Sequence, residues 1–207
     1  MRPSHELSST APALFLVRYS LLTAHYSLPF GGCRVSAPRK LPWLLLLSAL
    51  IIVADRLTKT LVSGRIAMGD AITVIPGFLR ITHWLNEGAA FSLFADSASP
   101  NAVRWGLIAF SAIAGIAVLI ALIRLGSTIS LTTIALALVL GGAIGNLHDR
   151  IRYGSVVDFI EVHIFGYHWP DFNVADSCIV IGACLLLLDS LLPQKTAEAS
   201  SIEIQQP

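Results

Sequence analysis

Two aspartates of this chain lie in surroundings that disfavour a negative charge. Asp176 stands at the entrance of "NVADSCIVIGACLLLLDSLL", residues 173–192, and Asp158 lies among the apolar residues of "SVVDFIEV", with no lysine or arginine within five positions. Acids in such places mark functional sites more often than not. Two carboxylates held close cannot both ionise easily, so one keeps its proton while the other accepts a proton from water. Such a pair can hydrolyse a peptide bond without a metal or another cofactor.

Other catalytic chemistries find little support in the sequence. Neither a G-x-S-x-G elbow nor an H-E-x-x-H pair occurs, and Ser177 has no histidine at a supporting spacing. A metal site is an alternative, with ligands from His148, Asp149, His163 and His168. Because their spacing fits no recognised pattern, we expect no metal and no other cofactor.

The two aspartates belong to a chain with the composition of a membrane protein. Hydrophobic residues make up 55% of its 207 residues and charged residues only 13%, about half the share usual in a soluble domain. Charge-free apolar windows predict membrane helices at 105–123 and 129–147. Two further windows, 41–62 and 174–192, are long enough to cross but carry charged residues near their ends.

Four spans place both ends of the chain at one face of the membrane, so the intervening turns alternate between the faces. The end of the first span, the loop after it, the end of the third span and the start of the fourth all share the opposite face. This arrangement brings a set of polar residues to one membrane boundary: Asp55, Asn86, Asn146, Asp149, Arg150, Asp158, Asn173 and Asp176. Lysine and arginine are distributed too evenly to predict which face is cytoplasmic.

Most of these residues also have a local explanation. Asp176 can be an acid favoured at a helix N-terminus, and Asp55 can pair with Lys59 four residues later. A small transporter subunit is the competing function, with intramembrane acids that relay protons or ions. Transporters distribute such acids along the depth of several spans, whereas the second and third windows carry no charge.

The loops and ends complete the predicted organisation. We expect a membrane all-α fold of four transmembrane helices, with a small extracytoplasmic β-sheet between the first two, because residues 70–85 resemble two strands around a Pro76-Gly77 turn. The aromatic residues of the loop 158–172 suit the bilayer interface. We expect a poorly defined extension at 1–38, a membrane domain at 39–193 and a polar tail at 194–207. A net charge of +1 argues against nucleic-acid binding.

Five segments, in order, resemble the motifs of the signal peptidase II family, the lipoprotein signal peptidases. They are "ADRLTK" at 54–59, "NEGAAFSLF" at 86–94, "GGAIGNLHDR" at 141–150, "GSVVDF" at 154–159 and "FNVADS" at 172–177. The resemblance extends from about residue 41 to 192. His148 departs from the family pattern, which more often has an apolar residue there.

The resemblance implies an aspartic endopeptidase of the bacterial inner membrane. Such an enzyme cuts the signal peptide from diacylglyceryl-modified prolipoproteins, immediately before the lipidated cysteine. Asp158 and Asp176 match the catalytic pair, and a further set matches residues that bind substrate or shape the site: Asp55, Asn86, Gly88, Asn146, Asp149, Arg150 and Asn173. The resemblance also implies cytoplasmic termini and an active site at the periplasmic or outer face. Its partners would be prolipoproteins and membrane lipid, and we expect a monomer.

Overall fold

The fold is a set of four long helices with a small antiparallel sheet at one end. A computed structural model describes residues 40–88 and 100–192. Along the chain the elements are α2 (Leu41–Arg65), β1 (Ala71–Ile75), β2 (Leu79–Asn86), α3 (Pro100–Leu125), α4 (Leu131–Tyr153), β3 (Val156–Ile164), β4 (Tyr167–Phe172) and α5 (Val174–Leu191). The expected extension at 1–38 and tail at 194–207 lie outside the described residues, as does most of the motif "NEGAAFSLF".

In the part of the chain that the structure describes, four helices are long and apolar enough to cross a membrane: α2, α3, α4 and α5. The four predicted spans are therefore confirmed. The two charge-free windows underestimated their helices: α3 runs from Pro100 and α4 continues to Tyr153. The sequence windows stopped early because they excluded charge, whereas a helix can extend past the apolar core of the bilayer into the polar interface.

Local signals explain where the helices begin and end. A proline, Pro42, occupies the first turn of α2, where its missing N–H costs nothing. Ser130 caps α4 by accepting a hydrogen bond from the backbone N–H of Thr133, and Gly154 ends the helix in a left-handed conformation, with φ 84°. Asn173 caps α5 in the same manner as Ser130 caps α4. Of these residues, Gly154 and Asn173 stand where the chain passes between a helix and the sheet.

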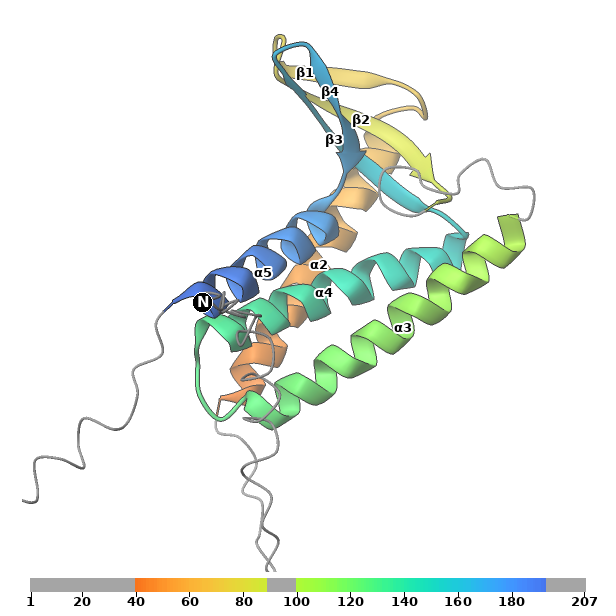
Figure 1. The fold of residues 1–207 in the computed structure, drawn as a ribbon. Helices are drawn as coiled ribbons and strands as arrows, with labels where there is room; N and C mark the ends of the chain where they lie inside the picture. The colour runs from red at the N-terminus through yellow and green to blue at the C-terminus, as the bar shows by residue number, and fades with distance from the viewer. Residues whose placement is uncertain (1–39, 89–99, 193–207) are drawn as a thin grey trace, which may run out of the picture. The chain divides into compact units, whose positions relative to one another are not determined.

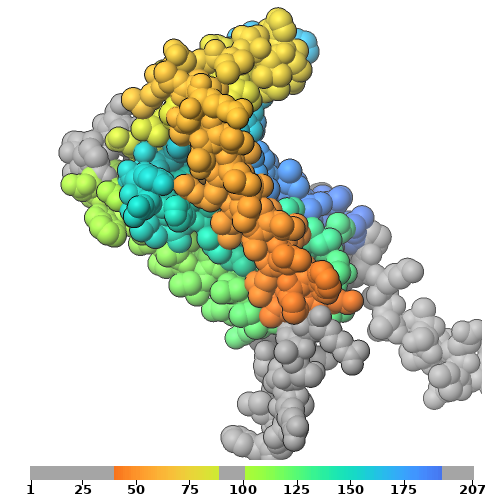
Figure 2. All heavy atoms as spheres, turned by 180° about the vertical axis from the view of Figure 1, so that it is seen from behind, coloured from red at the N-terminus to blue at the C-terminus, as the bar shows by residue number. Residues whose placement is uncertain are grey.

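Helix α4 lies at the centre of the packing and contacts α2, α3 and α5 (Figure 1). Its inner face includes the buried residues Ala137 and Leu140, which pack with Leu44 of α2 and Leu122 of α3. Glycine allows α5 to approach closely: a Cβ on Gly142 would lie 2.4 Å from the carbonyl oxygen of Ala175. Seen from the opposite side, α2 crosses the face of the other helices, and the first hairpin continues from its end (Figure 2). Helix α4 is thus the element against which the others are positioned.

The sheet combines two hairpins from distant parts of the chain in the order β1-β2-β3-β4. The β1-β2 hairpin turns at Pro76-Gly77, where Gly77 has φ 73°, and this confirms the sheet expected between the first two spans. The β3-β4 hairpin turns through two residues, Phe165 and Gly166, both with positive φ, as two-residue hairpin turns require. Strands β3 and β4 extend the sheet into a segment that sequence analysis had assigned to interfacial aromatic residues.

Pairing between β2 and β3 joins the two hairpins and places polar residues beside each other. Trp84 lies opposite Asp158, and Asn86 lies opposite Val156. Asn86 is therefore a diagonal neighbour of Asp158 on the same face of the sheet. Only Asn173 separates β4 from α5, so the end of the sheet leads directly into the start of the last helix.

Candidate active site

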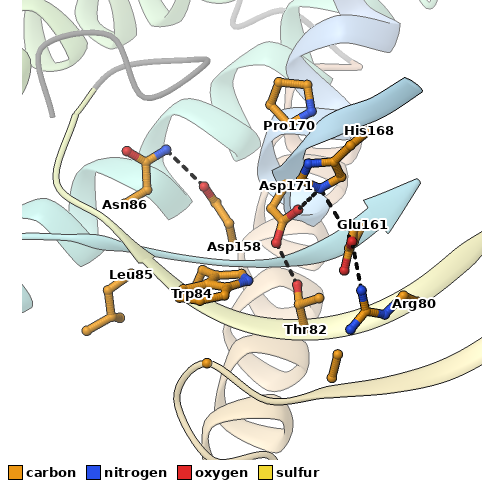
Figure 3. A pocket seen from close by; sticks show the side chains of 12 residues that line it. Arg80, Thr82, Trp84, Leu85, Asn86, Asp158, Glu161, His168, Pro170 and Asp171 are labelled. Carbon is orange, nitrogen blue, oxygen red and sulfur yellow. Dashed lines mark hydrogen bonds and ion pairs between the residues drawn. The ribbon is translucent and has the colours of Figure 1, made fainter. Parts of the chain in front are cut away.

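Asp158, the third residue of β3, is buried and accepts a hydrogen bond on each carboxylate oxygen. The side-chain amide of Asn86 donates to Oδ2 at 2.9 Å, and the amide of Asn173 donates to Oδ1 at 2.8 Å. Figure 3 shows Asn86 pointing toward Asp158 from the neighbouring strand. Strand pairing and the start of α5 together determine the orientation of this carboxylate.

Asp176, the third residue of α5, forms a reciprocal cap with Asn173. The backbone N–H of Asp176 donates to Oδ1 of Asn173 at 3.0 Å, and the backbone N–H of Asn173 donates to Oδ2 of Asp176 at 3.3 Å. The side-chain amide of Asn146, on α4, donates to Oδ1 of Asp176 at 2.7 Å. Because Asn173 also donates to Asp158, this one buried residue links the two aspartates.

The surroundings of Asp158 favour its protonated form. Burial raises the pKa of its carboxyl group from the usual 3.8 to about 7, and the negative charge of Asp176 adds to the increase. Hydrogen bonds from Asn86 and Asn173 and the positive charge of Lys59 oppose it. Asp158 can therefore hold a proton close to neutral pH, as a general acid must.

A buried lysine contacts residues that lie next to the aspartate pair. The ammonium of Lys59, 1% exposed, lies 2.8 Å from Oδ2 of Asp55, 2.7 Å from Oδ2 of Asp149 and 3.0 Å from Oδ1 of Asn146. Its ammonium thus forms ion pairs with two carboxylates and donates a hydrogen bond to Asn146, on α2 and α4. Arg56 forms a second ion pair with Asp149, so two cations balance two buried carboxylates.

This network also orients the residues around Asp176. Because Lys59 occupies the oxygen of the Asn146 amide, the nitrogen must point the other way, toward Asp176. Asp55 accepts a hydrogen bond from the backbone N–H of Ala175 at 3.1 Å, which ties α2 to the first turn of α5. Lys59 therefore helps to position Asp176 indirectly. It contacts Asn146, which donates to Asp176, and Asp55, which accepts from the backbone of the neighbouring Ala175.

Arg150, near the end of α4, reaches the start of the loop that follows β2. Its guanidinium donates to the carbonyl oxygen of Gly88 at 3.2 Å, while the N–H of Gly88 donates to Oδ1 of Asn86 at 2.9 Å. Arg104 of α3 donates to the carbonyl oxygens of Arg150 and Ile151. The chain segment next to Asn86 is thereby attached to the ends of two helices.

The structure brings together the whole set of polar residues predicted from topology and resemblance. They lie at one end of the helices and are connected by the contacts described above: Asp55, Asn86, Gly88, Asn146, Asp149, Arg150, Asp158, Asn173 and Asp176. Sequence analysis missed Lys59 and Arg56 as parts of the site. The available signal was the pair Asp55–Lys59 in an otherwise apolar span, which was interpreted only as a local ion pair.

The histidines proposed as an alternative metal site do not gather as one group. His148 lies near Asp149, with Nδ1 3.5 Å from Oδ1. Among the described residues, the metal-binding side chains that do come together are Glu161, His163 and His168, on β3 and β4. The earlier grouping of His148 with the other two histidines is therefore not supported by the geometry.

A pocket of about 520 Å³ opens on the sheet side of Asp158. Asn86 and Asp158 line one part of it, and Glu161, His168 and Asp171 line another (Figure 3). Of the two aspartates, Asp158 lines this pocket and Asp176 does not.

The role of Lys59 can be tested by removing its charge. We expect Lys59→Met to lower the free energy of unfolding in detergent by about 3–5 kcal/mol, because Asp55 and Asp149 would remain buried with too few cations. Lys40→Met, at an exposed lysine, is the matched control and should have little effect. Adding Asp55→Asn to Lys59→Met should recover part of the loss. Equal stability of the Lys59→Met and Lys40→Met proteins would contradict the analysis.

The raised pKa of Asp158 predicts a pH dependence of stability. The folded protein binds a proton at Asp158 that the unfolded chain releases above about pH 4, so this residue's contribution is complete at low pH and is lost as pH rises to about 7. Relative to Asp158→Asn, which cannot ionise, the wild type should lose stability across this range, on the order of a few kcal/mol. Denaturant titrations of both proteins from pH 4 to 8 measure the difference. A constant difference would show that the pKa is not raised.

Comparisons with known proteins agree with the geometry. The family profile described as "Signal peptidase (SPase) II" matches residues 47–192. Lipoprotein signal peptidase of Ectopseudomonas mendocina is 46% identical over 162 residues, covering 78% of this chain and 94% of the relative. That of Pseudomonas fluorescens strain Pf0-1 is 48% identical, covering 77% and 93%.

A solved structure also matches the fold. It is described as a bacterial membrane enzyme determined by the in meso method at 2.3 Å resolution, and it aligns with a TM-score of 0.62 and 30% identity. The alignment covers 83% of this chain and 97% of that one. The profile match, the close relatives and the shared fold all coincide with the part of the chain that carries the linked aspartates. The chain therefore belongs to the signal peptidase II family.

Proposed function

We propose that Asp158 and Asp176 are the catalytic pair with which this signal peptidase removes signal peptides from diacylglyceryl-modified prolipoproteins. The observation that carries the proposal is the link through Asn173, which holds two buried carboxylates at the end of the membrane helices. The bond to be cut is the one immediately before the lipidated cysteine.

We assign the two carboxylates different roles. Asp158, with a pKa near 7, serves as the acid that donates a hydrogen bond to the scissile carbonyl. Asp176, whose carboxylate accepts hydrogen bonds from the Asn146 side chain and the Asn173 backbone N–H, serves as the base. Asp176 takes a proton from the attacking water and later returns a proton to the leaving amine. The pair ends the cycle with the proton it began with, so no cofactor is consumed.

The site suits a substrate that is itself held in a membrane. A prolipoprotein of this kind is anchored by an apolar signal helix and by two acyl chains, each of which favours burial by roughly 0.8 kcal/mol per methylene. Both anchors would hold the scissile bond at the depth where the helices end and Asp158 and Asp176 meet. Orientation of this kind lowers the barrier by fixing the carbonyl near the activated water.

Placement in the cell follows from the same proposal. The protein is a multi-pass membrane protein, and its polar end would face the periplasm or cell exterior, where signal peptides emerge, with both termini in the cytoplasm. A bacterial inner membrane is the expected location. One copy of the chain carries every residue of the proposed site, which is consistent with the expected monomer, and the net charge of +1 argues against nucleic-acid binding.

The competing transporter function is not supported. The charged residues of the candidate site gather at one end of the helices and hold each other there by ion pairs. Helix α3 carries charge only near its two ends, at Arg104 and Arg124. Acids along the depth of several helices, as ion relays require, are not found in the described spans.

Replacement of either aspartate tests the pair directly. We expect Asp158→Asn and Asp176→Asn each to abolish cleavage of a diacylglyceryl prolipoprotein by the purified protein, because an amide can neither hold nor release the shared proton. Loss of the signal peptide is followed by gel mobility and mass spectrometry. Asp189→Asn is the matched control: Asp189 lies near the other end of α5, where Thr132 donates to it, and cleavage should stay within a few fold. Substantial cleavage by either variant would remove that residue from the pair.

The second test concerns the lipid. An unmodified precursor with the same sequence keeps the signal helix but lacks the second anchor. We therefore expect cleavage of the lipidated precursor and little or none of the unmodified one, with the cut before the modified cysteine. Equal rates on both would reject specificity for lipoproteins and leave a general membrane aspartic peptidase.

A further inference from the structure

Three side chains on the β3-β4 hairpin converge outside the aspartate pair. Glu161 and His163 are two residues apart on β3 and therefore share a face, and His168 of β4 lies directly opposite His163. The two imidazole rings lie 5.2 Å apart between centroids. The potential ligand atoms of all three residues lie within 4.8 Å of one another. The hairpin thus presents two imidazoles and one carboxylate at one point.

The contacts at this point are crowded around a single oxygen atom. Oε1 of Glu161 lies 2.6 Å from Nε2 of His163, 3.5 Å from Nε2 of His168 and 3.1 Å from Nη1 of Arg80. His163 and Arg80 lie within hydrogen-bond distance of this oxygen and match its two lone pairs, whereas His168 hydrogen-bonds to Oδ1 of Asp171 at 3.2 Å. A neutral imidazole that presents its lone pair to this oxygen would repel it. A cation between the nitrogen and oxygen atoms would remove this repulsion.

We propose that Glu161, His163 and His168 bind one divalent transition-metal ion, with Zn²⁺ as the best match. Two imidazoles and a carboxylate are a ligand set that zinc accepts, at about 2.0–2.2 Å from each atom. Tetrahedral ligands at that distance lie about 3.3 Å apart, and the two Glu161–histidine separations, 2.6 and 3.5 Å, fall on either side of this value. Since all three ligand atoms lie within 4.8 Å of one another, side-chain rotations would have to bring them to this spacing.

The surroundings provide further charge and an open position. Asp171 places Oδ1 3.2 Å from Nε2 of His168, while Thr82 donates to its other oxygen at 2.8 Å. Glu161, His168 and Asp171 also line the pocket that reaches Asp158 (Figure 3). The fourth coordination position would face this pocket. Arg80, which is 42% exposed, can release Glu161 at little cost because exposed ion pairs contribute little.

The site is separate from the proposed chemistry. No member of the cluster touches Asp158 or Asp176, and the aspartate pair needs no metal. A bound ion would instead connect β3 to β4 and add positive charge to the far part of the pocket. Cleavage by metal-free protein is therefore compatible with zinc binding at the hairpin.

Direct binding measurements test the proposal. The full-length protein, purified in detergent without a polyhistidine tag and treated with a chelator, is dialysed against Zn²⁺ and assayed by elemental analysis. We expect one zinc per chain from this site and at least a tenfold weaker affinity in His163→Ala, His168→Ala and Glu161→Gln. His148→Ala is the matched control and should bind as the wild type does. Absence of saturable zinc, or unchanged affinity in the His163 and His168 variants, would overturn the proposal.

Two further measurements separate zinc binding from misfolding of a variant and from peptidase activity. X-ray absorption of the zinc-loaded wild type should show two imidazoles and oxygen ligands, and this does not depend on any variant folding. A first shell containing sulfur, or a single imidazole, would contradict the assignment. The chelated protein should still cleave a lipidated precursor, so failure to bind zinc and failure of the aspartate pair are observed separately.

Discussion

The structure depends on a single buried ammonium group, that of Lys59. A lysine inside a membrane bundle is costly unless its charge is paired, and its partners are Asp55 and Asp149, by ion pairs, and Asn146, by a hydrogen bond. Each of these partners has a second task. Asp55 receives the backbone of α5, Asp149 receives Arg56, and Asn146 turns its amide toward Asp176. One charge thereby determines the arrangement of three helices at the end where the aspartates meet.

Close helix packing makes this arrangement possible. A Cβ on Gly145 would lie 2.8 Å from Oδ2 of Asp55, and one on Gly142 would collide with the backbone of Ala175. Small residues let α4 approach both α2 and α5 at the level of the network, as they do at other membrane helix interfaces. The charged groups of α2 and α4 can then form ion pairs with each other. Close packing of the apolar helices and contact between the polar residues therefore depend on the same glycines.

Much of this could be predicted from the sequence, because membrane topology is a strong constraint. Four apolar windows were enough to place eight polar residues at one boundary, and ordered motifs added Gly88 and the role that we propose for each. What could not be predicted depends on pairing between distant segments. Strands β3 and β4 were missed since their aromatic residues also suit a bilayer interface, and Lys59 was explained too easily by its neighbour four residues away. The register that sets Asn86 beside Asp158 follows from hairpin geometry, which periodicity alone does not determine.

The reciprocal cap at the start of α5 has a consequence for inhibition. Asn173 begins the last membrane helix and also holds both aspartates, so protein stability and the proposed catalytic geometry share the same atoms. A bacterium under selection by a compound that contacts Asn173 would have few escape routes there. Asp, Ser or Thr at this position could still cap the helix, but none of them carries the amide that donates to the Asp158 carboxylate. An inhibitor directed at this asparagine would therefore meet a position where resistance and loss of the enzyme coincide.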